Sequence, residues 1–177
     1  MEKFNVKCDV FIAGAGPAGI AAALSAAREG VDVVLCERYG GVGGGLVTTF
    51  VRPILGYVGN SNIGDEIVKR LSERDSMCST FEFTKYCLTM MLKEAGVRVF
   101  LQTQVVGARV DGGRIESVTG VSHSNEYEFS AKQYIDATGD GDLAALCGCE
   151  IEIGRDGDRL VQPASIMFTI DGISPDD

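Results

Sequence analysis

The chain has 177 residues, of which 45% are apolar and 23% are charged. These proportions are typical of a globular domain of ordinary size and exclude wholesale disorder. Acidic residues outnumber lysine and arginine by 25 to 16, the net charge is −9, and no basic stripe appears. Because nucleic acids are bound through basic surfaces that meet their phosphates, a nucleic acid is excluded as the expected partner.

The residues that commonly ligate metals are scattered. The one histidine, His123, falls in a polar turn, where we expect it to be solvated rather than catalytic. The cysteines show no CxxC pair and no zinc-like spacing, so we predict no metal site and expect reduced thiols in a cytoplasmic protein. They are Cys8, Cys36, Cys78, Cys87, Cys147 and Cys149. No uninterrupted run of about 20 apolar residues is present, so no membrane partner is expected.

The N-terminal segment predicts a strand, a glycine-rich turn, a helix and a second strand. Residues 6–13 (VKCDVFIA) form an apolar strand pattern, and residues 20–29 are alanine-rich and favour a helix. The turn between them, residues 14–19, reads GAGPAG. A second strand is expected over residues 31–36, with Glu37 at its end. This order and spacing are the fingerprint of a dinucleotide-binding βαβ unit.

Each glycine of that fingerprint has a physical reason. Gly14 permits the tight turn, Gly16 lets the backbone approach a diphosphate, and Gly19 lets the helix lie close to the sheet. The first turn of the helix offers unpaired N–H groups to the anion. The Glu37 carboxylate can accept hydrogen bonds from ribose hydroxyls and would repel a 2′-phosphate, which argues against NADP. The fingerprint leaves FAD and NAD both open.

The middle of the chain contains a second glycine cluster and two helices. Residues 38–45 (RYGGVGGG) are either a flexible surface loop or a backbone that passes close to a cofactor, and position favours the second. We expect an irregular segment over 46–59 and a short helix over 63–71, with Ser61 or Asn62 at its cap. The pattern Ser79-x-x-Glu82 predicts a second helix start, and Gly96 its end.

The rest of the chain predicts further strands and a second turn. A parallel strand is expected over 97–101, then antiparallel strands over 105–110, 114–121 and 127–132. Residues 134–137 predict another strand, followed by the turn TGDGD and a short helix over 143–147. Because ligands lie outside the carboxyl ends of parallel strands, we expect this turn beside the first glycine turn. Asp140 and Asp142 either cap the helix or bond sugar hydroxyls.

Three runs in this order carry a family resemblance: DVFIAGAGPAGIAAALSAAREGVDVVLCER, YGGVGGGLVTT and YIDATGDGDLAALCG. Together they resemble the FAD-dependent oxidoreductases of the glutathione-reductase-like Rossmann superfamily. The resemblance implies an α/β, Rossmann-like FAD/NAD(P)-binding domain with a parallel sheet and an antiparallel β-meander insertion. It implies FAD as the cofactor and the following binding residues: Gly14, Gly16, Pro17, Ala18 and Gly19 at the diphosphate; Glu37 and Arg38 at the adenosine ribose; Gly43 and Gly44 along the flavin; Val105 at the adenine; and Thr138, Gly139 and Asp142 completing the cradle.

The resemblance also implies a division of the chain. Residues 1–150 would form the FAD-binding domain, and residues 151–177 would begin a truncated substrate domain, with first strands at 151–153 and 165–170. A further C-terminal domain or another chain would complete the flavin site. The implied reaction is hydride transfer between a small organic substrate and flavin, with no catalytic residue identified. The alternatives are a non-catalytic dinucleotide-binding module and an NAD-dependent dehydrogenase domain.

Overall fold

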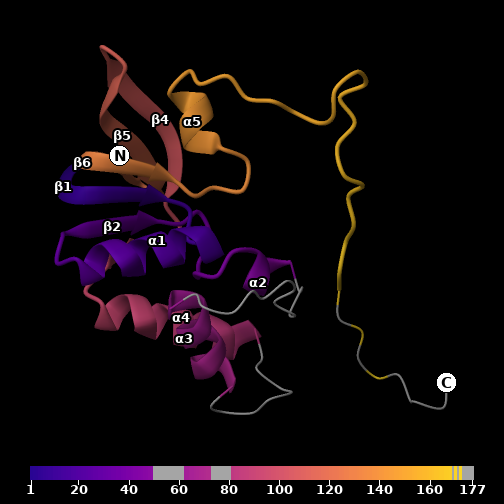
Figure 1. Ribbon diagram of the computed structural model, residues 1–177. Helices are drawn as coiled ribbons and strands as arrows, with labels where there is room; N and C mark the ends of the chain where they lie inside the picture. The colour runs from indigo at the N-terminus through magenta and orange to yellow at the C-terminus, as the bar shows by residue number, and fades with distance from the viewer. Residues whose placement is uncertain (50–61, 73–80, 169, 171, 173–177) are drawn as a thin grey trace.

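A six-stranded sheet forms the centre of the molecule (Figure 1). The computed structural model describes residues 1–49, 62–72, 81–168, 170 and 172. The strands in these ranges are β1 (Glu2–Ala13), β2 (Val33–Cys36), β3 (Arg98–Phe100), β4 (Gln104–Asp111), β5 (Arg114–Ser122) and β6 (Asn125–Asp136). The helices are α1 (Pro17–Arg28), α2 (Gly45–Thr48), α3 (Asn62–Ser72), α4 (Phe81–Glu94) and α5 (Asp142–Leu146). The strand order is β3-β2-β1-β6-β5-β4, which confirms the mixed α/β prediction.

Parallel pairing determines where the chain turns meet. β1 pairs with β2 on one side and with β6 on the other, and β2 pairs with β3, all in parallel. The register places Ala13 opposite both Cys36 and Asp136, the last residues of their strands. The turns that follow β1, β2 and β6 therefore leave the same edge of the sheet. The two predicted signatures are brought together by this register alone.

The β-meander belongs to the same sheet as the parallel strands. We expected separate strands over 127–132 and 134–137, but β6 runs unbroken from Asn125 to Asp136 and pairs with β1 along its length. Lys132 and Gln133, which interrupted the apolar pattern, are exposed, so their polarity is compatible with a continuous strand. β5 pairs antiparallel with the first part of β6, and β4 with β5. The meander therefore extends the parallel sheet.

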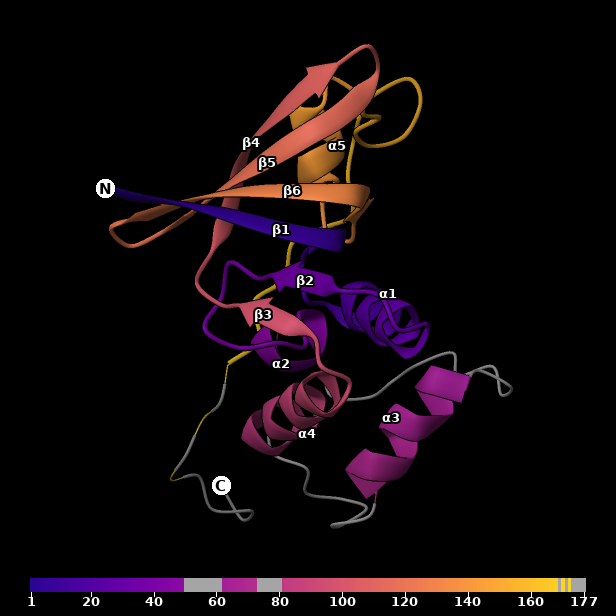
Figure 2. The same cartoon turned by 90° about the vertical axis from the view of Figure 1, so that its left-hand side faces the viewer.

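The two faces of the sheet carry two separate hydrophobic cores. Ile12 points toward the side of α1, α3 and α4, and packs with Leu24 and Leu88. Its neighbour Phe11 points to the opposite face, where it packs with residues of β5, β6 and α5. This is the alternation of side chains expected along a strand buried on both faces. Figure 2 shows the helices on one side of β1 to β3, and the meander and α5 on the other.

Some of the secondary-structure predictions differ from the structure, and some fall on residues outside the described ranges. Residues 45–48 form the short helix α2 inside the run that was expected to be irregular. Ser61 and Ser79, the predicted cap residues, lie outside the described residues. The strands predicted over 151–153 and 165–170 are wrong: in the described part of that segment the chain forms neither strand nor helix. A strand needs a neighbour to accept its hydrogen bonds, and the described chain places none beside this segment.

No helix within the described ranges is both long enough and apolar enough to cross a bilayer.

The second core allows a direct stability test. Phe11 is fully buried, with its ring centroid 4.9 Å from that of Phe129. Phe11→Ala should lower the free energy of unfolding by about 3–5 kcal/mol, because it removes buried area and leaves a cavity. Phe4→Ala is the control on the same strand, since Phe4 is 41% exposed and only stacks on Tyr127; its cost should be about 1 kcal/mol. Urea unfolding measures both, and equal losses would contradict the assignment of this core.

Candidate functional site

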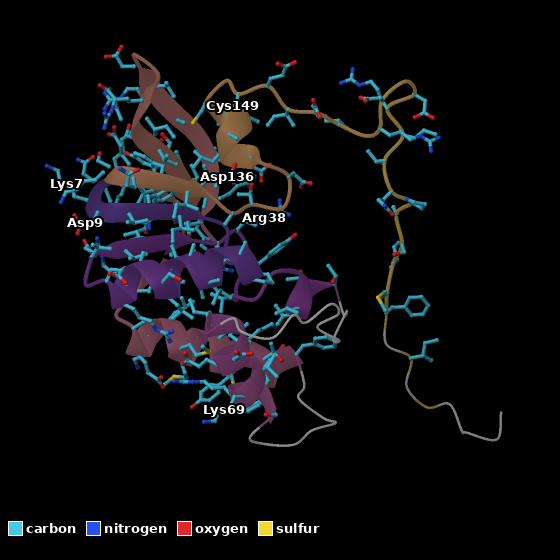
Figure 3. All side chains as sticks on the ribbon, viewed as in Figure 1. Lys7, Asp9, Arg38, Lys69, Asp136 and Cys149 are labelled. Atoms are coloured by element: carbon cyan, nitrogen blue, oxygen red, sulfur yellow. The ribbon has the colours of Figure 1, made fainter. Side chains whose placement is uncertain are left out.

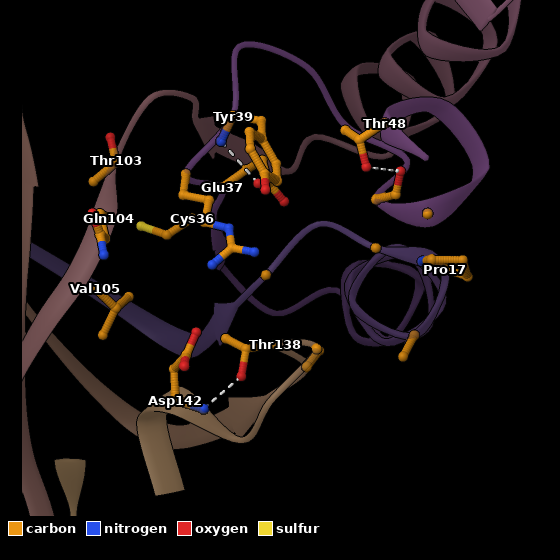
Figure 4. A pocket seen from close by; sticks show the side chains of 18 of the residues that line it. Pro17, Cys36, Glu37, Tyr39, Thr48, Thr103, Gln104, Val105, Thr138 and Asp142 are labelled. Atoms are coloured by element: carbon orange, nitrogen blue, oxygen red, sulfur yellow. Dashed lines mark hydrogen bonds between the residues drawn. The ribbon is translucent and has the colours of Figure 1, made fainter. Parts of the chain in front are cut away.

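A cleft of about 460 Å³ lies at the sheet edge where β1, β2 and β6 end (Figure 4). Most of the residues predicted from the sequence line it: Gly14, Gly16, Pro17, Ala18, Glu37, Arg38, Gly44, Val105, Thr138, Gly139 and Asp142. Figure 3 shows Arg38 and Asp136 toward this end of the sheet, and Lys7 and Asp9 toward the opposite end. The register of the parallel strands therefore gathers residues from three distant segments into one cleft.

Two of the glycines in the first turn are required by the fold itself. Gly14 has a φ of +92°, and a Cβ there would lie 2.6 Å from the carbonyl oxygen of Ala137. A Cβ on Gly19 would lie 1.8 Å from the carbonyl oxygen of Gly14. These contacts let the turn after β1 pack against α1 and against the turn after β6. Gly19 does not line the cleft, so packing is the reason for a glycine there.

Gly16 and Gly139 are different, because the protein does not need a glycine at either position. Neither has a positive φ. Among the described residues, and leaving out its own chain neighbours, a Cβ on Gly16 would be 4.0 Å from the nearest atom, the Cα of Gly44, and a Cβ on Gly139 would have no atom within 4 Å. Both residues line the cleft. The lack of side chains at these two positions therefore leaves space in the cleft and is not required for the packing of the protein itself.

The second glycine cluster packs directly onto the first turn. The N–H of Gly43 donates to the carbonyl of Ala15 at 2.8 Å. A Cβ on Gly44 would lie 2.7 Å from the Cα of Gly16. Gly43 itself is buried against Val47 and does not line the cleft. Gly44, in contrast, lines the cleft.

The Glu37 carboxylate links the turn after β1 to the turn after β2 by hydrogen bonds. Its side chain is buried, and its Oε2 accepts a hydrogen bond from the N–H of Ala15 at 2.8 Å. Its Oε1 accepts one from the N–H of Tyr39 at 2.9 Å. A carboxylate has about four acceptor positions, so each oxygen keeps capacity for a ligand hydroxyl. Sequence reasoning assigned Glu37 to a sugar only, and missed that it also fixes the glycine turn.

The cleft has limited positive charge. Among the described residues that line it, Arg38 is the only basic one, and its Cζ lies 4.9 Å from the ring centroid of Tyr39. The other electropositive feature is the start of α1, where Pro17 occupies the first helical position and the N–H groups of Ala18 and Gly19 have no acceptor within the helix. An anionic group is therefore favoured at the start of α1.

The turn after β6 is held by Asp136, a residue that the sequence analysis did not select. Its Oδ1 accepts hydrogen bonds from the N–H and the hydroxyl of Thr138, and its Oδ2 accepts one from the N–H of Ala144 at 2.8 Å. Partial burial raises the pKa of Asp136, but these hydrogen bonds, led by that of the Thr138 hydroxyl, outweigh burial and hold the pKa below its ordinary value. The carboxylate is therefore ionised in the folded protein at neutral pH.

These contacts decide between the two interpretations of the acidic residues in the turn. The hydroxyl of Thr138 accepts a hydrogen bond from the N–H of Asp142 at 2.8 Å, so Thr138 and Asp136 cap α5. The carboxylate of Asp142 lines the cleft and, within the described residues, has no hydrogen-bond partner of its own (Figure 4). Asp140 is exposed and does not line the cleft. Asp142 is thus free to meet a ligand, and Asp140 is not placed to do so.

Several lining residues were missed from the sequence. They are Cys36, Tyr39, Gly45, Thr48, Thr49, Thr103, Gln104 and Ala137. The hydroxyls of Thr48 and Thr49 already donate to carbonyls of their own short helix. Cys36 is buried, and burial raises the pKa of its thiol, which stays neutral. Thr103 and Gln104 adjoin Val105, so their position at the start of the same strand was the available signal.

The remaining chemically reactive residues lie elsewhere. His123 is exposed in the β5–β6 turn, with its Nε2 3.0 Å from Oε1 of Gln102, and it does not line the cleft. The five cysteines within the described ranges form no disulfide, and Cys78 lies outside these ranges. The described residues contain no group of three or more His, Cys, Asp or Glu side chains arranged to hold a metal ion.

The strand order, the crossover helices and the position of the cleft define a Rossmann-like α/β domain of the kind that binds dinucleotides. The model of the family described as FAD dependent oxidoreductase matches residues 9–177. The chain therefore belongs to the FAD dependent oxidoreductase family, as the sequence resemblance indicated, and FAD is its cofactor.

Individual relatives support the same assignment. A digeranylgeranylglycerophospholipid reductase from Methanocella arvoryzae is 25% identical over 74% of this chain and 39% of its own length. A thiamine thiazole synthase from Pyrococcus abyssi is 29% identical over 77% of this chain and 59% of its own. A geranylgeranyl bacteriochlorophyll reductase-like structure from Thermoplasma acidophilum shares the fold, with a TM-score of 0.61, 18% identity, and coverage of 82% and 43%. The chain thus spans 39% and 59% of the two curated relatives.

Gly16→Ala tests whether the cleft is reserved for a ligand. Because no protein atom is closer than 4.0 Å to the added Cβ, the free energy of unfolding should change by less than about 1 kcal/mol. FAD binding should weaken by about 1–3 kcal/mol, the scale of over-packing, as measured by fluorescence titration. Gly19→Ala is the control: its Cβ would overlap the Gly14 carbonyl, so it should lose stability. Normal FAD affinity in Gly16→Ala would remove this position from the site.

Asp136→Asn tests the cap that holds the second turn. The variant presents an amide N–H₂ where a backbone N–H needs an acceptor, so it should lose about 1–3 kcal/mol of unfolding free energy at pH 7. Since the folded-state pKa is lowered, the advantage of the unaltered protein is complete above the ordinary pKa of 3.8 and disappears as the pH falls through the lowered value. Urea unfolding at several pH values measures this. The control is Asp140→Asn, at an exposed residue of the same turn, which should change the free energy of unfolding by less than about 0.5 kcal/mol. A loss in Asp136→Asn that does not depend on pH would contradict the role of the Asp136 carboxylate in this cap.

Proposed function

We propose that this chain is the FAD-binding part of an oxidoreductase that transfers hydride between a small organic substrate and flavin. The observation that carries the proposal is the pair Gly16 and Gly139, which face one cleft and lack side chains that the protein itself would tolerate. A cradle built of bare backbone beside the start of α1 suits a diphosphate. The family assignment makes FAD the dinucleotide concerned.

Different lining residues would contact the diphosphate, the adenosine ribose and the remaining hydroxyls of FAD. The diphosphate would lie against the backbone of Gly16, Pro17 and Ala18, where the unpaired N–H groups of α1 point. Glu37 would accept hydrogen bonds from the adenosine ribose with the lone pairs that Ala15 and Tyr39 leave free. The unpartnered carboxylate of Asp142 would accept bonds from hydroxyls on the other side of the cleft.

When bound, FAD supplies the capacity to accept and donate hydride, and the protein binds and orients it. The residues beside the cleft do so mainly through backbone groups that α1, β2 and β6 hold in place. Glu37 also restricts the choice of nucleotide. Its buried carboxylate would repel a 2′-phosphate on the ribose, so the site favours nucleotides with a free 2′-hydroxyl.

We further propose that a substrate domain follows the described fold, in a longer chain or in another chain. Residues 151–168 form neither strand nor helix, and their large apolar side chains are exposed, for example Ile166 at 87% and Phe168 at 73%. Apolar side chains arranged in this way favour burial against another surface. That domain would supply the substrate contacts and cover the flavin. The described cysteines form no disulfide, which supports a cytoplasmic location.

The proposal is tested by identifying what the purified protein binds. The protein is denatured, any released chromophore is identified by mass, and the stripped protein is titrated with FAD and with NAD. FAD uptake is expected. Retention of NAD in place of FAD would instead support a nicotinamide-dependent dehydrogenase, and FAD uptake without reduction by any organic donor would support a non-catalytic module.

Competition sharpens the test at Glu37. ADP should displace FAD, whereas ADP that carries an additional 2′-phosphate should compete at least about tenfold more weakly, because its 2′-phosphate meets the Glu37 carboxylate. Glu37→Gln should narrow that difference by removing the negative charge. Equal competition by both nucleotides in the unaltered protein would show that Glu37 does not face the ribose.

A further inference from the structure

The geometry of the cleft locates the base-binding wall. The start of α1 lines the cleft, and so does Glu37, which directly follows β2. A nucleotide with its diphosphate at α1 and its ribose at Glu37 must place its base beyond Glu37, away from α1. The chain found there is the start of β4. The N–H of Thr103 donates to the carbonyl of Glu37 at 2.8 Å, which fixes this segment beside the ribose position.

The wall formed by Cys36, Thr103, Gln104 and Val105 has few side chains able to bond a base (Figure 4). The Thr103 hydroxyl already donates to the carbonyl of Leu101 at 3.0 Å. Val105 is apolar, and burial raises the pKa of the Cys36 thiol, so Cys36 remains a neutral and weak donor. The carboxamide of Gln104 is exposed to the cleft and, within the described residues, bonds to no other protein group.

We propose that Gln104 is a base-recognition residue whose carboxamide hydrogen-bonds the adenine of the cofactor and selects adenine-containing dinucleotides. This inference rests on the proposed function. A carboxamide carries a donor and an acceptor side by side. Adenine presents the same pair in reverse, an exocyclic amino donor beside a ring-nitrogen acceptor, which is why glutamine and asparagine pair with adenine edges in other complexes.

Neighbouring contacts support a defined position for this side chain. Gln104 opens β4 and is paired in register with Val121 of β5, so its backbone is held by the sheet. Arg38 and Tyr39 also line the cleft, and Arg38 lies over the ring of Tyr39, with Cζ 4.9 Å from the ring centroid. This stack offers flat surfaces to the faces of a base, whereas Gln104 offers hydrogen bonds to its edge. The two contacts are complementary and serve different parts of the purine.

The test uses ligands that share the ribose and diphosphate but differ in the base. Gln104→Leu keeps the side-chain size and removes both hydrogen-bonding groups. It should weaken binding of ADP and FAD about tenfold, the scale of one or two neutral hydrogen bonds. Binding of ribose 5-diphosphate, which has no base, should not change. Gln102→Leu is the matched control, because Gln102 is exposed two residues away and does not line the cleft; its affinities should equal those of the unaltered protein.

A second comparison isolates the adenine amino group. The unaltered protein should bind ADP about tenfold more tightly than purine riboside diphosphate, which lacks that group, and Gln104→Leu should lose most of this preference. Calorimetric titration measures each affinity. Unchanged ADP affinity in Gln104→Leu, or an equal loss for ribose 5-diphosphate, would overturn the role of Gln104 while leaving the proposed function intact. If the unaltered protein binds neither FAD nor ADP, both proposals are overturned.

Discussion

The buried carboxylate of Glu37 joins the parts of the site that lie far apart in the sequence. It accepts hydrogen bonds from the glycine turn after β1, through Ala15, and from its own loop, through Tyr39. Burying a carboxylate is costly unless such donors compensate for lost water, so the two turns and the acid stabilise one another. The backbone bond from Thr103 to the Glu37 carbonyl adds the start of β4 to the same arrangement. The shape of the cleft depends on these contacts.

A second acid does the corresponding work on the other side of the cleft. Asp136 ends β6 and binds Thr138 and the first turn of α5, so the backbone around Gly139 is held without help from Asp142. The carboxylates of Glu37 and Asp136 thus accept hydrogen bonds that stabilise the protein structure itself. Backbone groups, the spare acceptor capacity of Glu37 and the carboxylate of Asp142 remain open toward the cleft. The groups that fix the backbone are therefore largely distinct from the groups that are open to a ligand, which is consistent with a preorganised cofactor site.

Much of the fold and the site could be predicted from local patterns. The GAGPAG turn between an apolar strand and an alanine-rich helix indicated both the βαβ unit and the position of Gly14, Gly16 and Glu37. Other features depended on contacts with residues far away in the sequence, which a local sequence pattern does not reveal. The length of β6 was underestimated because Lys132 and Gln133 are polar, yet they are exposed on a strand that pairs with β1. The strands expected after residue 150 did not form, since the described chain offers them no neighbour.

The sequence by itself determined the type of each turn, the acid at the end of β2 and the family to which the chain belongs, because these depend on residues close together in the chain. Only the tertiary structure decided what each residue touches. It separated Gly14 and Gly19, whose Cβ atoms would strike backbone, from Gly16 and Gly139, whose Cβ atoms would not. It also placed the start of β4 beside Glu37, through the hydrogen bond from the N–H of Thr103 to the Glu37 carbonyl. Such contacts follow from strand register, which is set by the packing of the whole sheet.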